Sequence, residues 1–171
     1  AWEQVLSRQP AQPEALYSLA HLMWVGGEQA RADELITSAV RAQPTPSAVL
    51  EGVLTRYFAA TGRHVEALTS ARRAAELAPA DPVFVRQYAM AQINAGEREA
   101  AVLTAQAMTE KFPDDGLAWG ALATAAATAS RYELAGPAFE RWIALAPTDP
   151  DAHASQGYFL HLTGDDARAR T

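Results

Sequence analysis

The sequence predicts an all-α protein built as a stack of similar helix pairs. Alanine, the residue with the highest helix propensity, occupies 39 of the 171 positions. Proline recurs in register, with steps of 34, 35, 34 and 34 residues, at Pro10, Pro44, Pro79, Pro113 and Pro147. A period of this length indicates a repeated supersecondary unit that buries its apolar face by stacking on its neighbours.

Two further columns of residues with the same period divide each unit into two helices. Glycine, which suits the left-handed conformation that ends a helix, forms one column, with Ser130 in the remaining place: Gly27, Gly62, Gly96 and Gly164. The other column, which we expect on the inner face of the second helix, is Ala32, Ala67, Ala101, Ala135 and Ala169. Proline then stops each second helix, because it cannot continue the hydrogen-bond pattern.

We expect residues 1–171 to form one domain. In chain order, residues 1–12 are predicted to be the second helix of a preceding unit, and complete units to follow at 13–46, 48–81, 82–115 and 116–149. Residues 150–171 supply the first helix of a further unit and the start of its partner. Asp81 and Asp149 each precede a proline at the first helical position, and Asp114 or Asp115 can cap the intervening unit. Neither end has the polar capping helix of a finished array, so we expect a fragment of a longer one.

The repeat pattern resembles that of the tetratricopeptide repeat family over essentially the whole chain. The pattern of large, leucine and small residues in a first helix is clear at Trp119, Leu122 and Ala123, and the second-helix pattern at Ala135, Phe139, Trp142 and Pro147. Glu51 and His153 depart from it, since a large apolar residue is usual at their position. The resemblance implies a right-handed superhelical solenoid of antiparallel helix pairs.

Composition and motifs argue against several functions. A net charge of −6 is unlike that of nucleic-acid-binding proteins, and no apolar run approaches the length needed for membrane insertion. The chain has no cysteine for a thiolate metal site or a nucleophile, and Gly26–Gly27 is interpreted as a helix terminus rather than a phosphate loop. His153 and His161 are spaced too widely for a metal pair. We therefore expect no enzymatic activity, catalytic residue, metal or cofactor.

Residue usage indicates the origin of the protein, and the placement of its carboxylates indicates which face meets solvent. The abundance of alanine and arginine beside a single lysine resembles proteins of GC-rich bacteria, and fits the bacterial cytoplasm as well as the periplasm. Many carboxylates, Asp33, Glu34, Glu66 and Glu76 among them, fall in loops or second helices. We interpret them as a solvated outer face that keeps the array soluble, the alternative being an acidic docking surface for a basic partner.

By the same resemblance, first helices line a concave groove, and fixed positions of each unit point into it. The predicted peptide-binding residues are Tyr17, His21, Trp24, Arg56, Arg86, Gln87, Met90, Asn94, Thr124 and Tyr158. Equivalent positions hold the smaller side chains of Gly52, Val53, Gly120 and Ala121. Arginine pairs with carboxylates, and tyrosine and tryptophan are favoured interface anchors, so a segment with acidic and apolar side chains suits this groove.

We expect a non-enzymatic scaffold that binds a peptide or protein segment in the concave groove. One alternative is a substrate-recruiting arm of a larger enzyme, of the glycosyltransferase or sulfotransferase type. Another is self-association through uncapped ends, which would expose apolar helix faces.

Overall fold

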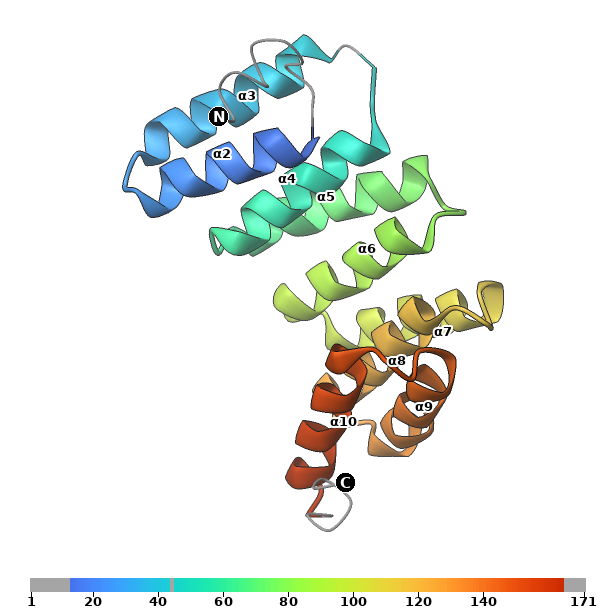
Figure 1. Cartoon of the computed structure of the whole chain (residues 1–171). Helices are drawn as coiled ribbons and strands as arrows, with labels where there is room; N and C mark the ends of the chain where they lie inside the picture. The colour runs from blue at the N-terminus through green and yellow to red at the C-terminus, as the bar shows by residue number, and fades with distance from the viewer. Residues whose placement is uncertain (1–12, 44, 165–171) are drawn as a thin grey trace. The chain divides into compact units, whose positions relative to one another are not determined.

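The computed structural model describes residues 13–43 and 45–164, and within this part every regular element is an α-helix. In chain order these are α2 (Pro13–Val25), α3 (Gln29–Ala42), α4 (Ala48–Ala60), α5 (His64–Leu77), α6 (Pro82–Asn94), α7 (Arg98–Lys111), α8 (Gly116–Thr128), α9 (Tyr132–Leu145) and α10 (Pro150–Leu162) (Figure 1). The prediction of an all-α helical repeat protein is confirmed. The helix expected at 1–12 and the residues after 164 lie outside the described part.

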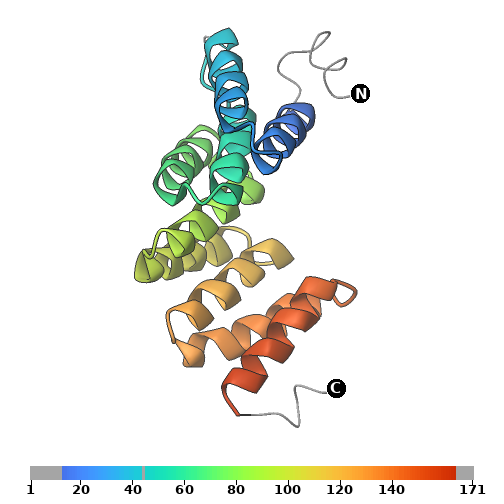
Figure 2. The same ribbon diagram turned by 90° about the vertical axis from the view of Figure 1, so that its left-hand side faces the viewer.

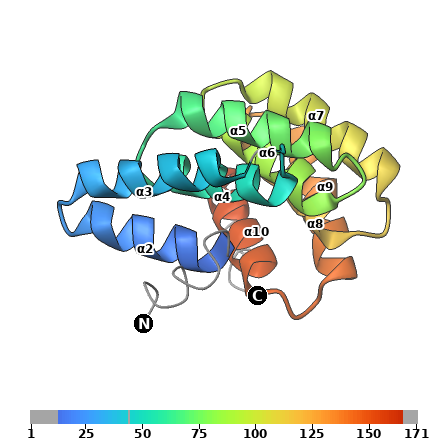
Figure 3. The same cartoon turned by 90° about the horizontal axis from the view of Figure 1, so that it is seen from above.

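The chain divides into two compact units, Ala1–Ala95 and Gly96–Thr171. The first contains α2 to α6 and the second contains α7 to α10. Within the first unit, α2 packs against α3 and α4, and α4 packs against α5 and α6; Figure 3 shows α2 and α3 lying side by side. Within the second unit, α8 packs against α7, α9 and α10.

The turn from each first helix to its partner needs one residue in the left-handed region. Gly27, Gly62, Gly96 and Gly164 have φ between 75° and 84°, and Ser130 takes the same role at 59°. After α2, the amide of Glu28 donates to the carbonyl of Met23 at 2.8 Å, which satisfies a carbonyl that the helix end leaves free. The glycines of this column therefore mark the C-terminal ends of the first helices.

Side-chain caps fix where the first helices begin. Asp81, Asp115 and Asp149 each accept a hydrogen bond from the backbone amide two residues later, at 2.7 to 3.0 Å. Of the two candidates for α8, Asp115 is therefore the cap. Asp114 instead accepts a hydrogen bond from Arg141 at 3.1 Å, an exposed contact between the two ends of neighbouring helices. Capping of this kind typically contributes about 1 kcal/mol per helix.

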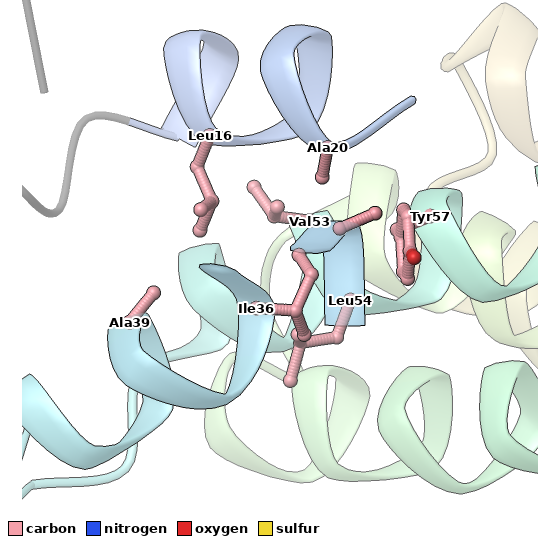
Figure 4. Close-up of a cluster of buried hydrophobic side chains, with 8 residues drawn as sticks. Leu16, Ala20, Ile36, Ala39, Val53, Leu54 and Tyr57 are labelled. Atoms are coloured by element: carbon pink, nitrogen blue, oxygen red, sulfur yellow. The ribbon is translucent and has the colours of Figure 1, made fainter. Parts of the chain in front are cut away.

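The core of the first unit forms where α2, α3 and α4 meet (Figure 4). Its buried members are mostly aliphatic or small: Leu16, Ala20, Ala32, Ile36, Ala39, Val53, Leu54 and Tyr57. Ala32 and its equivalents Ala67, Ala101 and Ala135 are fully buried. A small side chain at this position lets the two helices of a pair approach closely.

One polar network joins three helices in this unit. The hydroxyl of the buried Tyr57 donates to Asp33 at 3.1 Å, and Arg63 donates to the same Asp33 oxygen at 2.7 Å. Arg63 also pairs with Glu66 and lies 4.5 Å over the ring of Phe58. Asp33 and Glu66 were expected on a solvated outer face, and both side chains are 46% exposed. The Asp33 carboxylate has a further role that the sequence did not reveal, because it accepts a hydrogen bond from a phenol that burial removes from water.

Aromatic side chains fill the space that small residues leave in the second unit. Along α8 the fully covered side chains are mainly alanine. Trp142 of α9 lies against Gly120 and Gly116 and donates its indole N–H to Asp149 at 3.2 Å. Phe139 of α9 packs on Phe159 of α10, with ring centroids 5.2 Å apart, where Figure 2 shows these helices in orange and red beside each other.

Gly120→Ala is expected to lower the free energy of unfolding by about 1–3 kcal/mol, because overpacking forces the ring or the helix to move. The added carbon would lie 2.8 Å from Cε2 and 2.9 Å from Cδ2 of Trp142. Urea unfolding followed by circular dichroism measures the change. The matched control is Gly136→Ala, where the nearest atom is Cε1 of Phe159 at 3.9 Å, and which should gain about 0.5–1 kcal/mol as a better helix former. Equal stability of the two variants would contradict this packing.

Tyr57 is expected to make the stability of the first unit depend on alkaline pH. Burial, and then the charge and hydrogen bond of Asp33, raise the pKa of Tyr57 from 10.0 to about 12. The folded state therefore holds the phenolic proton more tightly than the unfolded state. The resulting stabilisation is complete below pH 10 and is lost as the pH rises through 12. Unfolding curves recorded across this range should show a steeper decline for the wild type than for Tyr57→Phe; parallel declines would refute the assignment.

Candidate functional site

Three of the predicted binding residues lie together on the first-helix face of the first unit. Tyr17 and His21, one turn apart on α2, stack with ring centroids 5.6 Å apart and planes at 7°. The guanidinium of Arg56 on α4 lies 4.7 Å from the centroid of the Tyr17 ring. All three side chains are half-buried. The face thus presents a planar, cationic and aromatic surface whose members hold one another in place.

Trp24, a fourth predicted residue, contributes to the core of the same unit. Its ring meets that of Tyr57 edge to face, with centroids 6.1 Å apart, and it packs on the buried cluster of α2 to α4. Its side chain is half-buried rather than exposed. Sequence reasoning does not separate these two roles, because a tryptophan at the end of a first helix suits both.

The predicted residues on α6 differ in exposure. Asn94 is exposed at the end of the helix, whereas Arg86, Gln87 and Met90 are half-buried. The Gln87 side chain lies against Gly52 of α4, where a Cβ atom would be 3.1 Å from its Oε1 atom. That oxygen is buried and has no hydrogen-bond partner. Gln87 therefore lies partly in the contact between α4 and α6.

The small residues expected to point into the groove do not reach it. Gly52, Val53, Gly120 and Ala121 are all buried. Gly52 is covered by Phe84 and Gly120 by Trp142, at distances that leave no room for a side chain. The expectation for these four positions was wrong. Where the first helix carries a small residue, a large side chain of a neighbouring helix can cover it, as Phe84 covers Gly52 and Trp142 covers Gly120.

The second unit contains a hollow of about 560 Å³ between α8, α9 and α10. Its lining is entirely uncharged: Thr124, Ala127, Thr128, Phe139, Ala154, Ser155, Tyr158, Phe159 and Leu162. Two predicted residues, Thr124 and Tyr158, lie on opposite helices of this hollow. Tyr158 is 66% exposed and Leu162 is 55% exposed, so both offer apolar surface to a ligand.

The polar groups of this hollow are directed mainly to the protein itself. The Thr124 hydroxyl donates to the carbonyl of Gly120 and the Thr128 hydroxyl to that of Thr124, each at 2.8 Å. Their oxygens keep lone pairs that can accept a hydrogen bond. The floor is aromatic, from Phe139 and Phe159. These two residues were not predicted from the sequence as part of a site, because they line the hollow only where α9 packs on α10. Such a hollow can hold an apolar side chain and hydrogen-bond a donor beside it.

The predicted set is divided between the units. Eight of its members lie on α2, α4 and α6, and two lie on α8 and α10. Within residues 13–43 and 45–164 no group of three potential metal ligands comes together. No helix in this part of the chain is long and apolar enough to cross a membrane.

Comparison with known proteins agrees with this architecture. A family model described as tetratricopeptide repeat matches residues 89–150. Residues 89–150 are therefore similar to tetratricopeptide repeats. A search of curated proteins finds no match. Tetratricopeptide repeats are generally non-catalytic protein–protein interaction modules.

Solved structures share the fold at low sequence identity. A tetratricopeptide repeat protein from Parabacteroides merdae aligns with a TM-score of 0.74 at 16% identity, over 99% of this chain and 67% of its own. TTC0263, a thermophilic tetratricopeptide repeat protein of Thermus thermophilus, aligns with 0.72 at 23%, over 94% and 87%. YrrB, described as having an unusual peptide-binding site, aligns with 0.59 at 14%, over 99% and 87%. These likenesses concern the fold.

A double-mutant cycle on Tyr17→Ala and Arg56→Ala tests the cationic and aromatic face. The two residues should couple by about 0.5–1 kcal/mol in the free energy of unfolding, the usual strength of an exposed cation–π contact. Urea unfolding of the wild type, both single variants and the double variant gives this coupling. A cycle with Arg31, which pairs instead with Glu28, serves as the control and should be additive. Additivity in both cycles would show that Arg56 does not hold this position in solution.

Proposed function

We propose that this protein binds a segment of a partner protein, and that the first helices α8 and α10 of the second unit receive one of its side chains. The observation that carries the proposal is the uncharged hollow between α8 and α10, which combines an aromatic floor with the exposed side chains of Tyr158 and Leu162. Exposed apolar surface around a concavity is a common property of binding sites. YrrB, a protein of similar fold, has a peptide-binding site, and this likeness supports the same kind of ligand here.

The composition of the hollow indicates which side chain it receives. No charged residue lines it, so a charged side chain would lose its hydration there without gaining a partner. An aliphatic or aromatic anchor loses no such hydration and gains contact with Phe139 and Phe159. On the face of the first unit, Arg56 can pair with a carboxylate of a bound segment, because a guanidinium stacked on a ring keeps N–H groups at its edge.

The two alternatives stay predictions of the sequence. They are recruitment of a substrate to a larger enzyme, of the glycosyltransferase or sulfotransferase type, and self-association through uncapped ends. Bacterial origin likewise remains a prediction from composition.

Selection of peptides from a random display library tests the proposed function. Peptides that bind the whole chain should share an aliphatic or aromatic residue, and Ala154→Glu should weaken their binding about tenfold or more, because it places an unpaired charge in the hollow. Fluorescence anisotropy with the selected peptides measures the affinities, and circular dichroism verifies the helix content of each variant.

The matched control is Ala144→Glu, which adds the same charge at an exposed position of α9 outside the hollow. It should leave the affinities unchanged. Selected peptides that bind both variants as tightly as the wild type would place their site elsewhere, and the proposal would fail.

A further inference from the structure

A second hollow, of about 460 Å³, lies within the first unit, away from the first-helix faces described above. It opens between the end of α3, the start of α4 and the end of α5. Val40, Leu50 and Leu77 form its apolar walls, and Val40 and Leu77 are each close to half exposed. Its polar lining includes Gln43, Glu51, Arg73 and Glu76. Of these residues, only Glu76 was considered for binding from the sequence, as one of many carboxylates of an alternative acidic docking surface.

Glu51 has an unusual place in this hollow. The repeat places it in register with Leu16, Val85, Trp119 and His153, which are larger or apolar. At two of these positions a side-chain nitrogen hydrogen-bonds the backbone carbonyl six residues earlier. Nε1 of Trp119 lies 2.7 Å from the carbonyl oxygen of Pro113, and Nε2 of His153 lies 2.9 Å from that of Pro147. An ionised carboxylate has no proton to donate and cannot repeat this contact. The structural role of the position does not account for a glutamate.

The Glu51 carboxylate is also poorly compensated. Its side chain is only 14% exposed, and its Oε2 atom is buried without a hydrogen-bond partner. Its other oxygen lies 3.7 Å from Nη1 of Arg73, beyond hydrogen-bond length, and the Arg73 side chain is 64% exposed. Gln43, which also lines the hollow, likewise has a buried Oε1 atom with no partner. A charge held in this way destabilises the fold unless a donor reaches it.

We propose that this hollow receives a lysine or arginine side chain of a partner protein, with Glu51 as its counter-ion. The unsatisfied atoms of Gln43 and Glu51 are both acceptors, so a ligand group that only donates is the complement. Glu51 and Glu76 outnumber Arg73, which leaves the lining with a net negative charge. The walls formed by Val40, Leu50 and Leu77 suit the methylene stem of a long basic side chain.

The basic residue therefore enters a different hollow, in a different unit, from the apolar anchor of the proposed function. The two hollows select different side chains. No charged residue lines the hollow of the second unit, whereas three charged side chains line this one. Binding at either can be lost without loss of the other.

The test uses two peptide probes that differ in charge alone: acetyl-Leu-Arg-Leu-amide, and the same peptide with citrulline, a neutral isostere of arginine. Each is titrated into isotopically labelled whole chain, and NMR follows the backbone amides. The arginine peptide should shift signals of residues around the hollow, such as Leu50 and Leu77, and the citrulline peptide should bind about tenfold or more weakly. Equal binding of the two peptides, or shifts confined to α8 and α10, would overturn the proposal.

Substitutions then separate the counter-ion from the general charge of the protein. Glu51→Gln should weaken the arginine peptide about tenfold, since it removes a charge-assisted hydrogen bond, whereas Glu34→Gln, exposed on α3 outside the hollow, should leave it unchanged. Glu76→Gln, at an exposed position of the lining, gives a second reading if Glu51→Gln folds poorly, and should weaken binding about threefold. Thermal unfolding distinguishes a binding role of Glu51 from a structural one. Glu51→Leu should raise the melting temperature while it abolishes binding of the arginine peptide, whereas loss of a structural glutamate would lower the melting temperature. Unchanged affinity in both Glu51→Gln and Glu76→Gln would overturn the proposal.

Discussion

Close contact between paired helices is the constraint on which the rest of this structure depends. Ala32, Ala67, Ala101 and Ala135 are fully buried at equivalent places, and a side chain as small as a methyl group allows the paired helices to approach closely there. Because this spacing is fixed by small residues, it recurs in each pair and sets where the larger side chains meet. In the second unit, Trp142 of α9 lies on Gly120 of α8, and Phe139 of α9 lies on Phe159 of α10. The distance between paired helices thus affects where the hollows and the exposed helix faces of each unit form.

Periodicity made the frame predictable. The glycine and proline columns act locally, through backbone conformation, so their effect does not depend on distant parts of the chain. Ser130 illustrates this: register alone indicated that it replaces a glycine, and its φ of 59° is what such a position requires. Capping by Asp81 and Asp149 was predictable for the same reason, since a cap bonds an amide two residues away.

Side-chain environments were less predictable, because they depend on residues far apart in sequence. Asp33 looked like an ordinary surface carboxylate until the fold brought it to Tyr57, 24 residues later. Position within the repeat did not distinguish Val53, which is buried, from Arg56, which is half-buried on an open face. Glu51 was visible in the sequence only as a departure from the pattern. Its meaning depends on Arg73 and Gln43, which lie on other segments.

The network of Asp33, Tyr57 and Arg63 has a consequence for how the first unit comes apart. In a protein built of stacked helix pairs, each pair contacts only the neighbouring pairs. The end pairs can therefore unfold while the middle pairs stay folded, unless the coupling between neighbouring pairs is strong. These three residues come from α3, α4 and the start of α5, and so join two successive helix pairs by hydrogen bonds that are broken together. The network therefore raises the cooperativity of melting at the junction of these two pairs. It makes them respond to heat or force as one body.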